Sequence, residues 1–178
     1  ANRYTEFRSA GLSDWHPTKR EMLISTRFGD TNQVHHVASP GGAREQITFY
    51  ADRVGGASYH PSDPDYFVFS KDAGGSEFFQ LFRYDLAAGQ GTLLTDGKSR
   101  NTGGLWSTAG DRIVYGSTRR TGADVDFYTM DPAEPQTDKL LTENKGGGWG
   151  VADWSRDDKL VISHGTSAAD VVLLRNHK

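Results

Sequence analysis

The strongest constraint on this chain is an aromatic residue that returns at one fixed point of a repeated pattern. Four such residues lie 44, 47 and 48 residues apart: Trp15, Tyr59, Trp106 and Trp154. Each is followed by a tight polar turn, a β-rich stretch, a Gly-containing or otherwise polar loop and a second β-rich stretch. In the first three units a further stretch ends in Ile-Thr or Leu-Thr. The same elements therefore recur in the same order along nearly the whole chain.

This repeat predicts an all-β fold. A period in the forties with four short strands in each period is typical of a β-propeller blade. The alternative is a β-sandwich with evenly spaced strands, but a sandwich does not require an aromatic residue at one fixed phase. We therefore predict a β-propeller of about four blades, each a four-stranded antiparallel sheet, with residues 1–178 forming a single propeller segment.

The predicted blades differ in completeness. Their approximate bounds are 10–48, 56–95, 103–142 and 150–178, and the fourth lacks the strand that ends in Leu-Thr. One explanation is that residues 3–8 supply the missing strand and close a four-bladed ring. The other, which we favour because four-bladed rings are the smallest of their kind, is that the chain is a segment of a larger propeller. Open blade edges predict self-association or pairing with a partner.

The recurring aromatic residues and the longer loops are the candidates for structural and functional roles. We expect the rings of Trp15, Tyr59, Trp106 and Trp154 to be structural anchors buried between neighbouring sheets. In an up-and-down blade, the loops between the second and third strands emerge on the same face as the crossings between blades. Binding residues usually lie on such loops. The candidate substrate- or partner-facing residues are Glu77, Arg100, Asn101, Arg119 and Trp149.

Charge and motifs limit the functions to consider. The formal net charge is −3, and no run of basic residues exceeds the pair Arg119-Arg120, so we predict no nucleic-acid partner. No apolar run is long enough for a membrane helix, and we predict no membrane partner. The sequence contains no Gly-x-Ser-x-Gly pentapeptide, the elbow that carries the nucleophile of α/β-hydrolases. We therefore predict that this chain alone is not an enzyme and has no catalytic residues.

We also predict neither a cofactor nor a metal ion. There is no cysteine, and the adjacent His35 and His36 would point to opposite faces of a strand, so they could not share a metal. His16 and His60 both precede proline at the same phase of the repeat, which indicates turn residues. Turn capping is the simpler role for the acidic pairs, although either could bind Ca²⁺ weakly; they are Asp124 with Asp126 and Asp157 with Asp158.

The segments 75–86, 93–101 and 128–132 resemble the N-terminal propeller of prolyl oligopeptidase-family serine peptidases, in particular the dipeptidyl aminopeptidase and acylaminoacyl-peptidase branch. The resemblance extends from Asp14 to Ser155, and the blade pattern is also similar to TolB-type and WD-repeat-like propellers. In the peptidase family the propeller covers the mouth of an α/β-hydrolase domain and limits substrates to short peptides.

The resemblance implies that this chain is the non-catalytic propeller portion of an oligopeptide-cleaving serine peptidase. It would control substrate access to a hydrolase domain that is absent from the chain, and would meet the peptide substrate through that domain. The alternative is an interaction propeller of the TolB or WD-repeat kind, which binds a protein partner across its loop face. No catalytic residue of the family can be carried over, and the sequence leaves the cellular compartment open.

Overall fold

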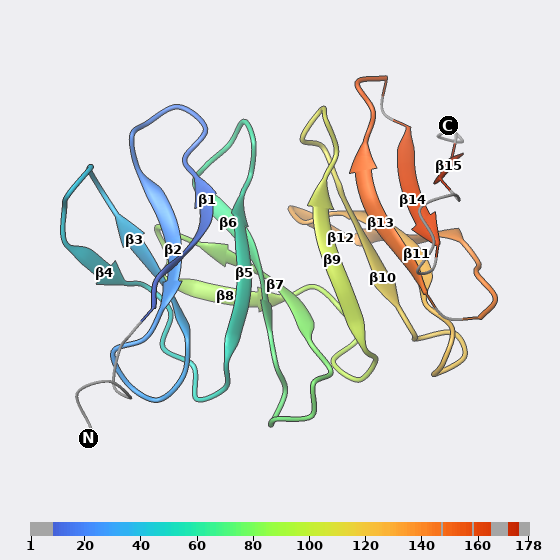
Figure 1. Ribbon diagram of the computed structural model, residues 1–178, viewed down its shortest axis with the longest axis horizontal. Helices are drawn as coiled ribbons and strands as arrows, with labels where there is room; N and C mark the ends of the chain where they lie inside the picture. The colour runs from blue at the N-terminus through green and yellow to red at the C-terminus, as the bar shows by residue number, and fades with distance from the viewer. Residues whose placement is uncertain (1–8, 147, 158, 165–170, 175–178) are drawn as a thin grey trace. The chain divides into compact units, whose positions relative to one another are not determined.

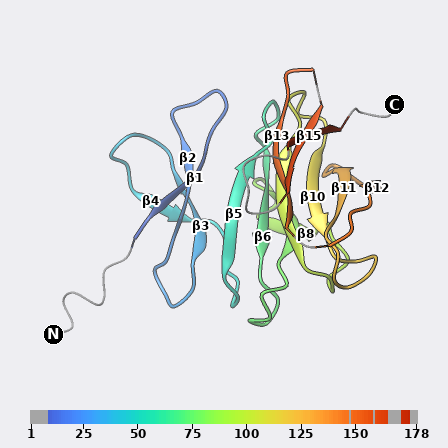
Figure 2. The same cartoon turned by 45° about the vertical axis from the view of Figure 1, so that its right-hand side comes forward.

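The described part of the chain is built from fifteen strands in four antiparallel sheets, and the all-β prediction is confirmed. A computed structural model describes residues 9–146, 148–157, 159–164 and 171–174. The chain passes through the sheets in sequence order, from blue to red (Figures 1 and 2). Within each sheet neighbouring strands are also consecutive in sequence. None of the described residues forms a helix that is long and apolar enough to cross a membrane.

The first three sheets have four strands each and the fourth has three. The first sheet contains β1 (Gly11–Trp15), β2 (Met22–Thr26), β3 (Gln33–Val37) and β4 (Arg44–Gln46); the second contains β5 (Val54–Tyr59), β6 (Tyr66–Lys71), β7 (Gln80–Asp85) and β8 (Gln90–Leu93). The third contains β9 (Asn101–Trp106), β10 (Ile113–Ser117), β11 (Asp126–Asp131) and β12 (Glu134–Thr142); the fourth contains β13 (Trp149–Trp154), β14 (Leu160–His164) and β15 (Val171–Leu174). The proposed strand over residues 3–8 lies outside the described residues.

Short polar turns join the first two strands of each sheet. Between β9 and β10, the Ser107 hydroxyl donates to the Asp111 carboxylate at 2.7 Å, and the Gly110 amide donates to the Ser107 carbonyl at 3.0 Å. Gly110 has φ of 76°, a left-handed conformation that glycine adopts without a steric penalty. These local contacts explain why the sequence places polar residues and glycine at this point of the repeat.

The described chain consists of two compact units, each with its own apolar core. The first comprises the residues up to Glu77 with Phe82–Thr92, and the second comprises Phe78–Leu81 with the residues from Leu93 onward. In the first unit, side chains of the first and second sheets share one cluster: Leu23, Val34, Val54, Ala57, Tyr59, Phe67, Phe69 and Tyr84. In the second, the third and fourth sheets share another: Val114, Phe127, Trp154, Leu160 and Ile162.

Polar contacts reinforce both of these sheet-to-sheet junctions. In the first unit, the Asp14 carboxylate accepts the Ser58 hydroxyl at 3.1 Å and the Tyr59 amide at 2.9 Å. The Tyr84 hydroxyl donates to the Ile47 carbonyl at 2.5 Å. In the second unit, the Thr108 hydroxyl donates to the Ser155 carbonyl at 3.1 Å. Each unit is therefore held by an apolar cluster with hydrogen bonds at its margin.

The four recurring aromatic residues are not equally buried. Tyr59, Trp106 and Trp154 are 3, 9 and 7% exposed, whereas Trp15 is 56% exposed. The structure thus differs from the expectation that the Trp15 ring is enclosed. In both units the anchor of the later sheet packs against the sheet before it, and Trp15 lies on the first sheet.

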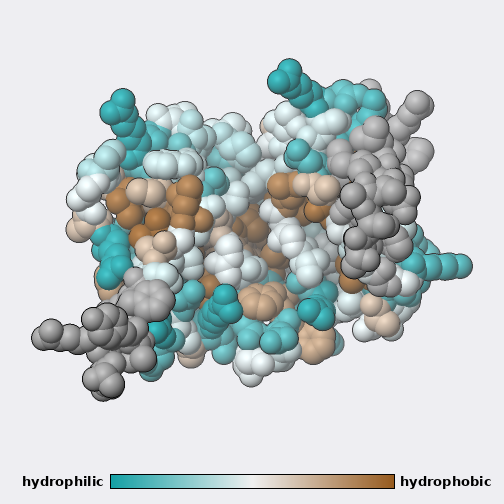
Figure 3. Space-filling model, viewed as in Figure 1, coloured by the Kyte–Doolittle hydropathy of each residue, from teal (hydrophilic) through white to brown (hydrophobic). Residues whose placement is uncertain are grey.

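Several other large hydrophobic side chains reach the surface, and Figure 3 shows a hydrophobic patch over the first sheet, at the upper left of the view. Besides Trp15, the exposed large hydrophobic residues in the described part of the chain are Leu12, Phe28, Phe49, Phe78, Leu86, Leu93 and Leu140.

Candidate functional site

The loop ends of the sheets are organised by a buried hydrogen-bond network at the first residue of the third strand. In the first sheet this residue is Gln33, whose side-chain carbonyl accepts the Thr48 hydroxyl at 2.9 Å and the Tyr50 amide at 3.1 Å. Its amide group donates to the carbonyls of Tyr50 at 2.9 Å and Asp52 at 3.4 Å. The Thr48 hydroxyl in turn accepts the Val34 amide at 2.8 Å. The network fastens the crossing to the next sheet onto β3.

The second sheet repeats this network 47 residues later. The buried Gln80 accepts the Thr95 hydroxyl at 2.8 Å and the Gly97 amide at 3.0 Å, and donates to the Ser99 carbonyl at 2.7 Å. Thr95 also accepts the Leu81 amide at 3.1 Å. Each of these residues is the counterpart of one in the first sheet. The repeat is therefore one of polar chemistry as well as of hydrophobic strands.

The third sheet carries a charged version of the network. Asp126, whose side chain is fully buried, occupies the place of the glutamines and accepts the Asn144 amide at 2.8 Å. Arg120 donates two parallel hydrogen bonds to this carboxylate, from Nε at 2.5 Å and from Nη2 at 2.9 Å. A paired fork of this kind is the strongest common way to hold a carboxylate. Here a carboxylate and a guanidinium replace a neutral amide and a hydroxyl.

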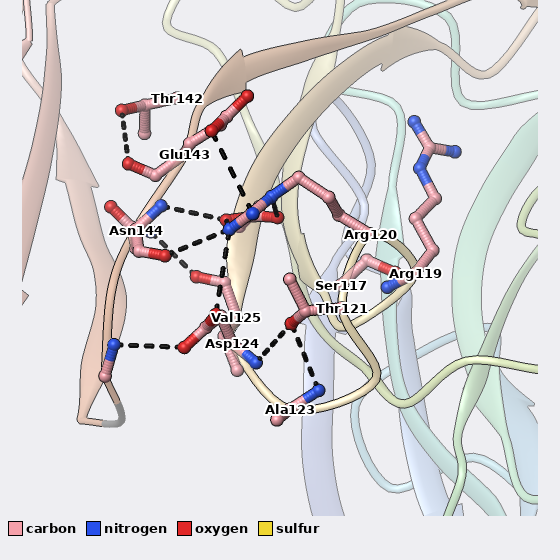
Figure 4. Close-up of polar contacts among 12 residues, drawn as sticks. Ser117, Arg119, Arg120, Thr121, Ala123, Asp124, Val125, Thr142, Glu143 and Asn144 are labelled. Atoms are coloured by element: carbon pink, nitrogen blue, oxygen red, sulfur yellow. Dashed lines mark hydrogen bonds and ion pairs between the residues drawn. The ribbon is translucent and has the colours of Figure 1, made fainter.

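Arg120 also connects two loops that are separated in sequence (Figure 4). Its Nη2 donates to the Asn144 carbonyl at 3.1 Å, and the Asn144 side-chain amide donates to the Val125 carbonyl at 2.7 Å. The Gly146 amide donates to the Asp124 carboxylate at 3.0 Å. The loop between β10 and β11 is thereby fastened to the crossing that leads to β13. We call the four side chains of Arg120, Asp124, Asp126 and Glu143, together with Asn144, the loop clamp.

The electrostatics of the loop clamp favour its charged state. Hydrogen bonds from Arg120 lower the pKa of Asp126, although burial of this carboxyl acts in the opposite direction. The bond with Asp126 raises the pKa of Arg120. Asp124 and Glu143 lie 3.8 and 3.9 Å from the same guanidinium. With three carboxylates around one cation, the loop clamp is acidic, and its arginine is not available to bind an anionic ligand.

The five candidate binding residues occupy very different environments. The side chains of Glu77 and Arg100 are exposed, and Glu77 has a left-handed φ of 61° in a loop where its amide donates to Asp72 at 3.0 Å. Asn101 is buried and donates to the carbonyls of Phe79 and Ser99 and to the side chain of Gln80. Asn101 therefore extends the Gln80 network and does not face solvent.

Arg119 and Trp149 contribute to the interior of the second unit. The Arg119 guanidinium pairs with Asp138 and lies 3.6 Å from the centre of the Tyr128 ring, while the Tyr115 hydroxyl donates to Asp138 at 2.9 Å. Arg119 and Arg120 point in different directions, and only Arg120 enters the loop clamp (Figure 4). Trp149 is half-buried against the apolar cluster of this unit. Among the five candidates, Glu77 and Arg100 thus have the most accessible side chains.

The histidines whose side chains are described have structural roles. The Nδ1 atom of His16 accepts the amides of Thr18 and Lys19 at 3.2 and 3.1 Å. His60 Nδ1 likewise accepts the amides of Ser62 and Asp63, at 3.2 and 2.7 Å. The Ser62 hydroxyl is 3.5 Å from the same nitrogen, whose lone pair is already engaged, so this pair is not an activated nucleophile.

The other two described imidazoles differ in burial, as their adjacent positions on a strand require. His35 is fully buried, with Nδ1 3.1 Å from the Gln33 carbonyl, and burial lowers its pKa. His36 Nε2 lies 3.1 Å from the Glu21 carboxylate. In the described residues no group of three or more His, Asp or Glu side chains is arranged to hold a metal ion.

Sequence reasoning missed the residues at the centre of the networks. It identified Ile47-Thr48 and Leu94-Thr95 only as strand ends, although Gln33 and Gln80 stand at the same distance before the two threonines. This shared interval was a detectable signal. Asp126 gave a weaker signal, because it stands 16 residues before Thr142 and the interval in the first two sheets is 15. The sequence indicated only turn capping for Asp126, since its role depends on contacts with Arg120 that the repeat does not encode.

Replacing Gln80 with alanine tests the structural role of the network. We expect the free energy of unfolding to fall by about 2–3 kcal/mol, because Thr95, Gly97 and Asn101 would lose a buried partner. Urea denaturation followed by circular dichroism measures the loss. The matched control is Gln90→Ala at an exposed position, which should change stability by less than about 0.5 kcal/mol. Equal effects of the two substitutions would show that the network is not stabilising.

Comparisons with known proteins agree with this architecture. No family model and no curated protein matches the chain. Among solved structures, TolB from Acinetobacter baumannii is 20% identical with a TM-score of 0.68, over 93% of this chain and 40% of that one. A TolB-type protein from Agrobacterium tumefaciens is 22% identical with a TM-score of 0.65, over 86% and 52%. A structure from a study of two prolyl endopeptidases is 15% identical with a TM-score of 0.69, over 96% and 28%.

These likenesses define the class of protein by its fold. The chain is a β-propeller segment, and the predicted similarity to TolB-type and prolyl-peptidase propellers is confirmed at the level of fold. It spans between about a quarter and about half of the length of these three structures.

Proposed function

We propose that this chain is the non-catalytic propeller portion of a serine peptidase that cleaves oligopeptides. In this proposal the loop face selects which peptides reach a hydrolase domain that lies outside residues 1–178. The observation that carries the proposal is the fastening of the loops by buried networks, at Gln33, Gln80 and Asp126. A gate that selects substrates by size and charge needs loops that keep their shape.

Selection of peptides by charge also requires accessible charged side chains on the loops. Glu77 and Arg100 expose side chains of opposite sign, which suits them to contacts with the charged ends of short peptides. The likeness to the prolyl endopeptidase structure over 96% of the chain supports the assignment to this class of propeller. Arg119, Asn101 and Trp149 would act indirectly, by holding the structure on which the loops rest.

The second candidate is a TolB-like propeller that binds a protein partner across its loop face. It is favoured by the similarity to two TolB-type structures, at 20 and 22% identity, and by the acidic character of the loop clamp. The reading frame downstream of the codon for Lys178 distinguishes the two proposals. Further blades followed by a Gly-x-Ser-x-Gly elbow are expected for the peptidase. A propeller that ends without this elbow would contradict the gating role and favour the interaction propeller.

A direct assay of the purified chain should detect no peptidase activity. The expected result follows from the absence of a nucleophile elbow in the sequence and from the engagement of His16 and His60 in backbone contacts. Release of a fluorophore from short peptide substrates, followed over hours at high protein concentration, measures it. Turnover that co-purifies with the folded chain and disappears on its denaturation would overturn the non-catalytic assignment.

If the whole reading frame encodes a peptidase, its selectivity tests the gate. We expect Arg100→Glu to change the ratio of kcat/KM for peptides with a free carboxyl terminus over the same peptides with an amidated terminus. Lys98→Glu, at an exposed position two residues away, is the matched control for charge. An unchanged ratio with Arg100→Glu would remove this residue from the proposed gate.

A further inference from the structure

The residue that follows the recurring threonine is exposed in each of the first three sheets. It is Phe49 in the first sheet, Asp96 in the second and Glu143 in the third. The second and third sheets each follow another sheet in the chain, so exposure is a property of this position in the repeat. In those two sheets the exposed side chain is acidic, which suits contact with water. Of the three, only the first sheet places a large aromatic ring at this position.

The ring of Phe49 has no packing role among the described residues. It is 76% exposed, more than any other large hydrophobic side chain in the described part of the chain. Phe28, in the loop between β2 and β3, differs because its ring lies 4.8 Å from the His35 ring and 4.7 Å from the Arg44 guanidinium, measured between centres. A single exposed phenylalanine is ordinary by itself. What distinguishes Phe49 is the backbone that holds it.

The buried Gln33 network fixes this backbone on both sides of Phe49. Before it, the Thr48 hydroxyl donates to the Gln33 side chain at 2.9 Å. After it, the Tyr50 amide and carbonyl both bond to the Gln33 side chain, at 3.1 and 2.9 Å, and the Tyr50 ring stacks on Phe69. A fixed backbone reduces the entropy lost when a side chain binds, and rigid aromatic residues supply much of the energy of many interfaces.

The same crossing is fastened to a loop on each side. The Val54 amide donates to the Asn32 carbonyl at 3.0 Å, and the Asp72 amide donates to the Arg53 carbonyl at 3.1 Å. Asn32 and Asp72 belong to the loops that follow β2 and β6. We call residues 49–53 and the adjoining segments 27–32 and 72–77 the loop platform. All three segments belong to the first unit.

Arg53 gives the loop platform a positive charge that a ligand can reach. Its side chain is exposed, and within the part of the chain that the structure describes no carboxylate pairs with its guanidinium. The neighbouring Asp52 carboxylate is engaged by the Lys71 ammonium at 3.4 Å. A guanidinium binds a carboxylate through two parallel hydrogen bonds. The Cα atoms of Phe49 and Arg53 are four residues apart, at most about 14 Å, a span that four residues of an extended peptide cover.

We propose that the loop platform binds a peptide segment with an aromatic residue and an acidic residue within about four positions of each other. The aromatic side chain packs on Phe49, and the acidic side chain pairs with Arg53. An aromatic centre with a charged rim suits a peptide, whereas a nucleic acid requires a basic surface. This inference rests on the proposed function, because it names the peptides that the loop face would select.

Titration of the isotope-labelled 178-residue chain, followed by NMR, tests the proposal. The probe is the peptide Gly-Phe-Gly-Glu-Gly, acetylated at one end and amidated at the other so that its ends carry no charge. Saturable shifts are expected at the amides of residues 49–53. Alanine in place of phenylalanine in the probe should weaken binding by about three- to tenfold, the range for loss of an aromatic pair. Binding that does not depend on this phenylalanine would overturn the proposal.

Phe49→Ala should weaken binding of the probe by the same factor, and Phe49→Tyr should retain it. The matched control is Leu86→Ala, at a residue that is 39% exposed in the turn between β7 and β8 of the same unit. Because both side chains are exposed, the variants should keep the urea midpoint of the wild type. Equal affinities of Phe49→Ala and Leu86→Ala, or a large drop in the midpoint of Phe49→Ala alone, would contradict the proposal.

The charge of Arg53 is tested by reversing it. Arg53→Glu should invert the preference between the probe and a peptide that carries lysine in place of glutamate. Arg20→Glu, at an exposed position in the turn between β1 and β2, is the control and should leave the preference unchanged. Glu77→Gln removes an anion of the loop platform and should raise the affinity for the acidic probe. A preference that Arg53→Glu leaves unchanged would remove Arg53 from the site.

Failure of this proposal and failure of the proposed function give different results. The blocked ends of the probe exclude the terminal charges that Glu77 and Arg100 are proposed to contact. A chain that binds no probe, in a reading frame that encodes a Gly-x-Ser-x-Gly elbow, would overturn the peptide site and leave the gate. Probe binding that depends on Phe49, in a frame without this elbow, would support the peptide site and contradict the gate.

Discussion

Replacement of Trp154 with alanine should destabilise the second unit by about 3–5 kcal/mol. The ring is 7% exposed and packs with Val114 and Phe127 of the third sheet. Its Nε1 group donates to the Leu105 carbonyl at 3.4 Å. Alanine would leave a cavity between the third and fourth sheets, because the backbone of two sheets cannot collapse to fill the volume of an indole.

Trp15→Ala is the matched control for this prediction. Trp15 follows aspartate and pairs with the start of the second strand, as Trp154 does, but its ring is 56% exposed. We expect a loss below about 1 kcal/mol, because the ring is largely exposed. Hydrogen exchange at the amides of β10 and β2 reports on the two units separately. A loss below about 1 kcal/mol for Trp154 would show that it is not an anchor.

The contrast between these two tryptophans explains what the sequence could and could not predict about the fold. The interval between anchors, the polar turns and the short β-rich stretches can be read directly from the sequence. They were sufficient to predict an all-β fold of antiparallel sheets. Burial of Tyr59 and Trp154 depends instead on the preceding sheet of the same unit. Trp15 has the sequence context of a buried anchor, and nothing in that context reveals that its ring is exposed.

The candidate loop residues show a similar division. A sequence reveals that Arg119 is charged and lies in a loop, but not that Asp138, distant in sequence, neutralises it. Asn101 looks like a solvent-facing polar residue, yet it is buried because Gln80 and two carbonyls use its amide hydrogens. Glu77 and Arg100 lie in the same kinds of loop but remain exposed. Whether such a side chain is buried or exposed depends on its partners in other loops and strands, and the sequence repeat does not identify those partners.

Asp126→Ala is the second substitution for which we expect a large effect. The free energy of unfolding of the second unit should fall by about 3 kcal/mol, the lower end for breaking a buried ion pair, because the guanidinium of Arg120 is 31% exposed and keeps some hydration. The Asn144 amide would also lose its acceptor. Asp124→Ala, at a more exposed carboxylate of the same loop clamp, is the control and should have a clearly smaller effect.

The pH dependence of stability gives this prediction a definite sign. The bond with Arg120 lowers the pKa of Asp126 in the folded protein relative to the unfolded chain, so the unfolded state binds more protons in acid. The stabilisation by the ion pair is complete above the pH range in which an aspartate normally titrates. It is lost as the pH falls through the lowered pKa of Asp126 in the folded protein. Denaturation midpoints between neutral pH and pH 3 should converge for the wild type and Asp126→Asn. Midpoints that stay equally far apart in acid would contradict a titrating ion pair.

A double-mutant cycle then separates the ion pair from the effects of burial. Arg120→Leu should destabilise the chain because it leaves the carboxylate of Asp126 buried without its fork of donors. Combining Arg120→Leu with Asp126→Asn replaces the charged pair by a neutral amide, the arrangement that Gln33 and Gln80 have in the first two sheets. The double variant should therefore be more stable than the sum of the single losses predicts. Simple additivity would mean that the two side chains do not act as a pair, and that the third sheet is not a charged version of the network in the other two.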